Sequence, residues 1–142
     1  MTVKQLSVFV ENRQGRLGEV LAVLKDNGVS ILSMSLADTT EYGLLRIIVN
    51  QPERGCEVLV AAGFSAMLTD VIIVKVPHVA GALQSILEKI AEKNISIEYL
   101  YGLSVATNDA TIVIKTSQLA VAAELLKSDG IEAMTQEELA VL

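Results

Sequence analysis

The chain has 142 residues, of which 51% are hydrophobic and 20% charged, and its formal net charge is −6. This length suits one ordinary domain or two of the smallest α+β domains. The apolar content excludes an intrinsically disordered chain, and no apolar run approaches the roughly 20 residues of a membrane helix. Because the charge is negative, the composition also argues against a surface that binds a nucleic-acid backbone.

The chain contains one cysteine, Cys56, and one histidine, His78. An internal disulfide, a thiolate metal site and a multi-histidine metal site are therefore excluded, and we expect neither a metal nor a cofactor. The residues Met1-Thr2-Val3-Lys4-Gln5 lead directly into a strand pattern without an apolar signal core. We therefore expect a cytoplasmic protein with no membrane and no nucleic acid among its partners.

The first half of the chain reads as strand, helix, strand, strand, helix, strand. Apolar residues alternate in the strands, they recur at helical spacing in the first helix, and Pro52 suits the first turn of the second helix. The expected ranges are Lys4–Val10, Arg16–Asn27, Ser30–Ala37, Gly43–Asn50, Pro52–Ala62 and Phe64–Leu68.

The second half repeats the first at an offset of 66 residues, which relates Gly15 to Gly81. The same offset relates the apolar stripes of the two first helices, Leu17, Val20, Leu21 and Leu24 against Leu83, Ile86, Leu87 and Ile90. It also relates Gly28 to Asn94, and both stand where a left-handed residue commonly ends a helix.

The second copy is expected to run through the same order of elements. The ranges are Val71–Val76, Gly81–Lys93, Ser96–Val105, Ala110–Thr116, Gln118–Ser128 and Ile131–Met134. Thr135-Gln136-Glu137-Glu138 then has the capping-box spacing of a short terminal helix. Two ferredoxin-like βαββαβ repeats of the α+β class follow, each an antiparallel sheet with helices on one face.

The two repeats are expected to occupy residues 1–69 and 70–142, with Thr69-Asp70 as nearly the whole connection. The strands Gly43–Asn50 and Val71–Val76 are apolar on both faces, whereas helices cover only one face. We therefore expect the other face to be covered by the other copy and by a second chain, in a homodimer. Met34, Met67 and Met134 are expected in the strand cores.

The first loop reads Val10-Glu11-Asn12-Arg13-Gln14-Gly15-Arg16-Leu17 and is followed by Asn27-Gly28-Val29-Ser30-Ile31. It resembles the ACT domain, a small ligand-sensing module of amino-acid metabolism. The nearest form has a Val-Glu-Asn-x-Pro-Gly-x-Leu loop, as in the acetohydroxyacid synthase regulatory subunit and the regulatory domain of phosphoglycerate dehydrogenase. Gln14 departs from the proline of that form. The second loop, Val76-Pro77-His78-Val79-Ala80-Gly81-Ala82-Leu83, matches more weakly but keeps the glycine and the leucine.

The resemblance implies a tandem ACT-domain protein that binds a small effector at the interfaces between paired copies. In that family, the first loop and the start of the second strand of a neighbouring copy contact the ligand. The positions implied here are Asn12, Arg13, Gln14, Gly15, Arg16, Leu17, Ser30 and Ile31, and in the second copy His78, Val79, Ala80, Gly81, Ala82, Leu83, Ser96 and Ile97. A glycine that opens a helix also favours a carboxylate at the helix N-terminus on physical grounds.

Each polar candidate has a structural alternative. Asn12 is either a ligand contact or a turn residue, and the loop arginines are either anion contacts or solvated side chains. His78 is an effector contact or a polar cap at the helix start. Ser30 and Ser96 either reach a ligand or hydrogen bond to their own backbone.

These features together predict a non-catalytic regulatory protein that binds an amino acid, since no phosphate loop, nucleophile elbow or zinc-protease motif is present. A regulated enzyme or regulator in trans is the expected partner. Two alternatives remain: a structural or protein-interaction ACT module without a ligand, and a small ferredoxin-like enzyme that uses His78.

Overall fold

The computed structural model describes residues 2–38, 41–103 and 109–142, and it divides into two compact units. The first unit consists of Lys4–Thr69 together with Ala140–Leu142. The second consists of Asp70–Leu139 together with the N-terminal residues up to Val3.

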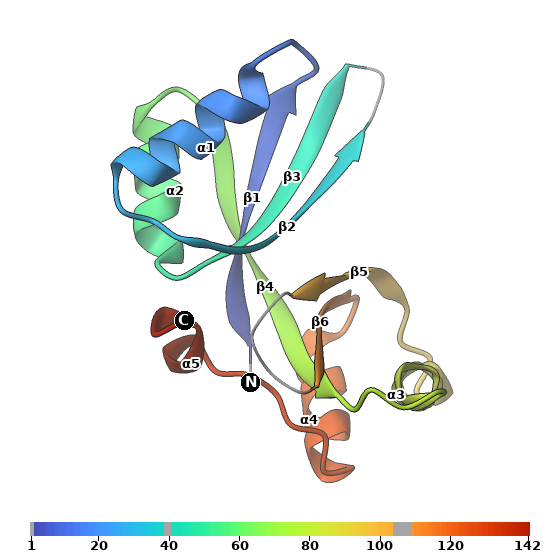
Figure 1. Ribbon diagram of the computed structural model, residues 1–142. Helices are drawn as coiled ribbons and strands as arrows, with labels where there is room; N and C mark the ends of the chain where they lie inside the picture. The colour runs from blue at the N-terminus through green and yellow to red at the C-terminus, as the bar shows by residue number, and fades with distance from the viewer. Residues whose placement is uncertain (1, 39–40, 104–108) are drawn as a thin grey trace. The chain divides into compact units, whose positions relative to one another are not determined.

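The first unit is a four-stranded sheet with two helices on one face (Figure 1). Its strands follow the order β2-β3-β1-β4, and β3 is antiparallel to both β1 and β2. The elements are β1 (Val3–Glu11), α1 (Arg16–Asp26), β2 (Ile31–Asp38), β3 (Tyr42–Val49), α2 (Pro52–Ala61) and the beginning of β4 (Ser65–Val76).

The core of the first unit lies between these helices and the sheet. Val20 and Leu24 of α1 and Leu59 of α2 are fully buried against the alternate residues of β1 and β3. Burying one such aliphatic side chain contributes about 1.5–3 kcal/mol. The apolar stripe expected for the first helix is thus the face that holds α1 on the sheet.

The second unit repeats this arrangement with strand order β4-β6-β5 and antiparallel pairing. Its core holds Ile86 and Ile90 of α3 and Leu126 of α4 against Ile72 and Ile114 of the sheet. Its elements are the remainder of β4, α3 (Ala82–Glu92), β5 (Ile97–Leu103), β6 (Ala110–Thr116), α4 (Leu119–Ser128) and α5 (Gln136–Ala140).

The expected pattern of two βαββαβ copies is confirmed, and so are several chain reversals. Gly28 and Asn94 have left-handed backbone angles, φ 71° and φ 58°. Thr135 caps α5, because its Oγ1 accepts a hydrogen bond of 3.2 Å from the N–H of Glu138. Of the predicted strand Ser96–Val105, the last two residues lie outside the described residues.

Two strand predictions need correction. The strands predicted at Phe64–Leu68 and Val71–Val76 are one strand, because β4 continues through Thr69 and Asp70 as a single strand of 12 residues. The predicted strand Ile131–Met134 is only a bridge of Ala133 to Val74. Two hydrogen bonds flank this bridge, Lys75 N to Glu132 O at 2.9 Å and Met134 N to Ile73 O at 2.8 Å, and α5 begins at Gln136.

The methionine prediction is correct for one residue of three. Met134 is buried, whereas Met34 is 39% and Met67 55% exposed. Met34 is on the edge strand β2, so it has a neighbouring strand on one side only. Met67 lies between Ala66 and Leu68, which pack on the core, so its side chain is on the sheet face that carries no helix.

Candidate functional site

The first loop is a tight turn that leads from β1 into α1. The N–H of Arg13 donates to the carbonyl of Glu11 at 2.7 Å, and the N–H of Arg16 donates to the carbonyl of Arg13 at 3.2 Å. The N–H of Glu19 then donates to the carbonyl of Gly15 at 3.1 Å, which closes the first turn of the helix. The chain thus reverses direction within five residues of the strand end.

The second loop has the same hydrogen bonds 66 positions later. They join Val79 N to Pro77 O at 2.8 Å, Ala82 N to Val79 O at 3.1 Å and Ser85 N to Gly81 O at 3.0 Å. The two loops therefore share one backbone conformation, although Gln14 stands where the resembling form has proline and Ala80 stands there in the second copy.

Each loop depends on a glycine with a left-handed backbone. Gly15 has φ 83° and Gly81 has φ 85°, and both are N-cap residues without a side-chain cap. An L-residue with a Cβ atom is strained at these angles. The first N–H of each helix, of Arg16 and of Ala82, donates to a loop carbonyl. The N–H groups that follow it have no intrahelical acceptor and lie at the positive end of the helix dipole.

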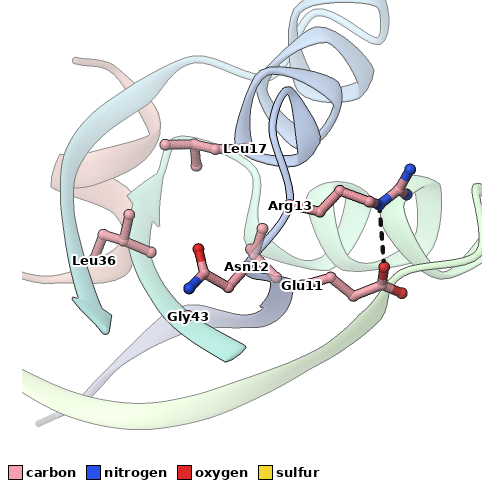
Figure 2. A pocket seen from close by; sticks show the side chains of 7 residues that line it. Glu11, Asn12, Arg13, Leu17, Leu36 and Gly43 are labelled. Atoms are coloured by element: carbon pink, nitrogen blue, oxygen red, sulfur yellow. Dashed lines mark ion pairs between the residues drawn. The ribbon is translucent and has the colours of Figure 1, made fainter. Parts of the chain in front are cut away.

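A cavity of about 280 Å³ lies beside the first loop. Its lining consists of Val10, Glu11, Asn12, Arg13, Leu17, Leu36 and Gly43. In Figure 2 the amide of Asn12 points toward Leu36, with Leu17 on the far side of the same space. An amide and two apolar side chains thus line the same cavity, next to the first turn of α1.

The two arginines of the first loop have partners within the protein. Arg13 pairs with Glu11 at 3.3 Å between Nε and Oε2, and in Figure 2 this pair lies on the opposite side of Asn12 from Leu36. Arg16 stacks over the ring of Phe64 at 4.1 Å and pairs with Glu19. In Figure 2 the guanidinium group of Arg13 points away from the Asn12 amide.

A cavity of about 420 Å³ lies beside the second loop. Its lining consists of Val76, Pro77, His78, Val79, Gly81, Leu83, Gln84, Ala110 and Ile112. Among these described residues there is no carboxylate, hydroxyl, thiol or amine side chain. His78 takes the place that Asn12 has in the first copy.

The candidates at the starts of β2 and β5 lie at the end of each sheet opposite to the loops; they are Ser30, Ile31, Ser96 and Ile97. Ile31 pairs with Val49, whereas Val10 at the loop pairs with Gly43. Six residues of strand separate the two positions on β3, which is about 20 Å at 3.4 Å per residue. The backbone N–H of Ser30 donates to Asn50 Oδ1 at 2.9 Å.

The second copy has the same separation. Ile97 pairs with Thr116 and Val76 with Ala110, and Ser117 N donates to Ser96 O at 3.2 Å. Within one unit, the strand starts and the loops therefore do not form one site.

The structure brings together only part of the predicted set and adds residues to it. Gln14, Gly15, Arg16 and Ala80 shape the loops but do not line the two cavities, and Ala82 lines another space. The wall residues Leu36 and Gly43, and in the second copy Gln84, Ala110 and Ile112, were not predicted. Leu36, Gly43, Ala110 and Ile112 come from neighbouring strands, so only the strand register reveals them, whereas Gln84 is in the first turn of α3.

The described residues contain neither a metal-binding cluster nor a membrane-spanning helix. No group of three or more histidine, cysteine, aspartate or glutamate side chains is placed to hold a metal ion. No helix in the described part of the chain is both long and apolar enough to cross a membrane.

Comparisons with known proteins agree on the fold. The family model described as an ACT domain pair matches residues 1–142. The crystal structure of protein BT0572 from Bacteroides thetaiotaomicron is similar at 33% identity and TM-score 0.93, covering 100% of this chain and 98% of that one. No protein of curated function matches the sequence.

Two solved regulatory subunits of aspartate kinase are similar in fold alone. The ligand-free form from Thermus thermophilus has 14% identity and TM-score 0.62, covering 88% of this chain and 91% of that one. The subunit from Thermus flavus has 15% identity and TM-score 0.60, covering 88% and 90%.

Proposed function

The chain belongs to the ACT domain pair family, and from this premise we propose that it is a non-catalytic regulatory protein that binds an amino acid at its two loops. The observation that carries the proposal is the first cavity. There Asn12, Leu17 and Leu36 line one space, with the amide of Asn12 directed toward Leu36, beside the start of α1.

This combination suits the three parts of an amino acid. The N–H groups at the start of a helix favour a carboxylate. The Asn12 side-chain oxygen accepts a hydrogen bond from an ammonium group. Leu17 and Leu36 offer apolar contact to the ligand side chain. The second loop repeats the backbone geometry with His78 as its polar group.

We propose that a second copy of the chain completes the site in a homodimer. Ser30, Ile31, Ser96 and Ile97 lie about 20 Å from the loop of their own unit, so they reach a ligand only from another copy. On the helix-free face of the first sheet, Phe9 and Met67 leave 49% and 55% of their surface exposed, and this supports an apolar contact between chains.

Regulation follows from linkage. A ligand that binds the paired arrangement more tightly than the unpaired one shifts the equilibrium toward pairing, and a regulated enzyme or regulator in trans would sense that shift. The free Cys56 thiol suits a reducing compartment, and the proposal therefore places the protein in the cytoplasm.

The test is a thermal-shift screen of the intact protein against the twenty amino acids. A ligand at 100 times its Kd adds about 2.7 kcal/mol to the free energy of unfolding. We expect Asn12→Ala and His78→Ala each to weaken the response. Asn27→Ala, at the other end of α1, is the matched control and should leave the response unchanged.

The alternatives predict different outcomes. If no amino acid raises the melting temperature, the protein is a structural or interaction module instead. An enzyme that uses His78 finds no nucleophile among the described residues that line its cavity.

The homodimer is tested by light scattering after size exclusion. Phe9→Glu should give a monomer. Val60→Glu should not, because Val60 is on α2 and its side chain is exposed to a similar extent, 54% against 49% for Phe9. A monomeric wild-type protein at all concentrations would contradict the dimer.

A further inference from the structure

The two cavities differ in one wall. In the first copy, Leu36 pairs with Leu45 across the β2–β3 ladder. In the second copy, the equivalent pair across the β5–β6 ladder is Gly102 with Ile112. Directly paired residues project from the same face of a sheet. Leu36 lines the first cavity, and a side chain at position 102, which does not itself line the second cavity, would project from the same face as Ile112, which does.

The missing side chain at position 102 changes the exposure of its partner. Leu45 is fully buried and does not line the first cavity, whereas Ile112 is half-buried and lines the second. The cavity volumes differ in the same sense, about 280 Å³ where Leu36 is present and about 420 Å³ where Gly102 replaces it.

A second exchange accompanies the first. Position 43 is glycine in the first copy, and a Cβ there would lie 3.0 Å from Leu36 Cδ1. The equivalent position in the second copy is Ala110, opposite Val76 as Gly43 is opposite Val10. The glycine of this wall is thus on β3 beside Leu36 in the first copy and on β5 in the second, where alanine stands on β6 and no large side chain replaces Leu36.

The fold does not require glycine at position 102. Its φ is not among the positive values, the irregularity of β5 falls between Ile97 and Tyr99, and a Cβ would meet no atom of the described residues within 4 Å. Glycine inside a strand weakens it, and it often marks a place where a ligand approaches closely.

We propose that the residue at this strand position selects the ligand by size. Leu36 restricts the first loop to amino acids with a short side chain, such as serine or alanine. Gly102 opens the second cavity to a larger apolar side chain, such as leucine or phenylalanine, which Leu83, Val79 and Ile112 would contact. This proposal rests on the proposed function, because it names the ligand class at each loop.

The test uses the intact ¹⁵N-labelled protein and follows the amide signals of Gly15 and Gly81 during titration. The probes are L-serine, L-alanine, L-leucine and L-phenylalanine. We expect the short amino acids to shift the Gly15 signal and the large ones to shift the Gly81 signal.

Two substitutions change the size of the residue at this wall position, one in each cavity. Gly102→Leu should weaken leucine and phenylalanine binding at the second loop at least about tenfold, since a misfit of one methylene in an apolar pocket changes discrimination about 10- to 200-fold. Leu36→Ala, at a half-exposed edge position, should let leucine bind at the first loop. The unchanged loop of each variant is its internal control, and thermal melting checks folding.

The outcomes distinguish the size selection from the proposed amino-acid binding on which it rests. If both loops bind all four probes equally and neither substitution alters this, the size selection is refuted while amino-acid binding stands. If no probe shifts either glycine signal but another of the twenty amino acids raises the melting temperature, the size selection is refuted and amino-acid binding stands; if none of the twenty does, both are wrong.

Discussion

Replacing Gly15 by alanine should destabilise the protein, whereas replacing Gly18, three residues later, should stabilise it. Gly15 has φ 83°, and Gly18 is an exposed residue of α1 that is not among the positive-φ glycines. A Cβ at either glycine would meet no atom within 4 Å. Steric crowding therefore plays no part, and the two substitutions differ only in backbone conformation.

The magnitudes follow from that difference. An L-residue in the left-handed region costs roughly 1–2 kcal/mol, partly offset by about 0.4–1 kcal/mol from the stiffer unfolded chain, so Gly15→Ala should lose about 1 kcal/mol. Gly18→Ala should gain about 0.5–1 kcal/mol from helix propensity. Gly15→Asn should be milder than Gly15→Ala, because asparagine tolerates this conformation, as Asn94 does at φ 58°.

Urea unfolding followed by circular dichroism measures these changes. With a slope of about 1–3 kcal/mol/M, the midpoints of Gly15→Ala and Gly18→Ala should lie roughly 0.5–2 M apart. If both variants shift in the same direction, or if Gly15→Asn is no better than Gly15→Ala, the left-handed glycine does not hold the loop. The ligand response at the first cavity should fall in Gly15→Ala and persist in Gly18→Ala.

Three further predictions concern positions on or beside α2 and α5, away from the loops. Gly55→Val should lower the free energy of unfolding by about 1–3 kcal/mol in urea, because even a Cβ there would lie 3.2 Å from Leu6 Cδ2; an unchanged midpoint would contradict tight packing under α2. Burial, and then the adjacent glutamate, raise the pKa of the Cys56 thiol, so iodoacetamide at pH 8 should react more slowly than with free cysteine and catch up as pH rises; equal rates at pH 8 would refute this. Thr135→Ala should cost about 1 kcal/mol in thermal melting by removing the cap on the N–H of Glu138, whereas Ser117→Ala, an exposed control, should cost nothing.

Local patterns predicted the elements well because their causes are local. The stripe at Val20 and Leu24 defines a helix whatever surrounds it, and it is the buried face of α1. The left-handed ends at Gly28 and Asn94 follow from the same kind of signal. The errors occurred where contacts with another segment determine the structure. Examples are β4, which runs on as one strand, and Ala133, which makes only a bridge to Val74.

The candidate site was predicted only along the loops. Asn12 and His78 stand on loops whose glycine is visible in the sequence, and both line cavities. The arginines illustrate the limit, because the partners of Arg13 and Arg16 include a strand-end carboxylate and the ring of Phe64. No periodicity in the sequence shows which partner a long side chain takes.

The sequence by itself determined that the chain is one pattern written twice, with a glycine-opened helix in each copy, because periodicity and backbone freedom belong to single segments. Only the tertiary structure decided the walls of the two cavities. Leu36 and Gly102 look unrelated in the sequence, and their equivalence appears only through the residues they pair with, Leu45 and Ile112. Strand register depends on contacts between residues far apart in the sequence. It places different wall residues beside two loops of the same backbone conformation, so the two cavities differ in size.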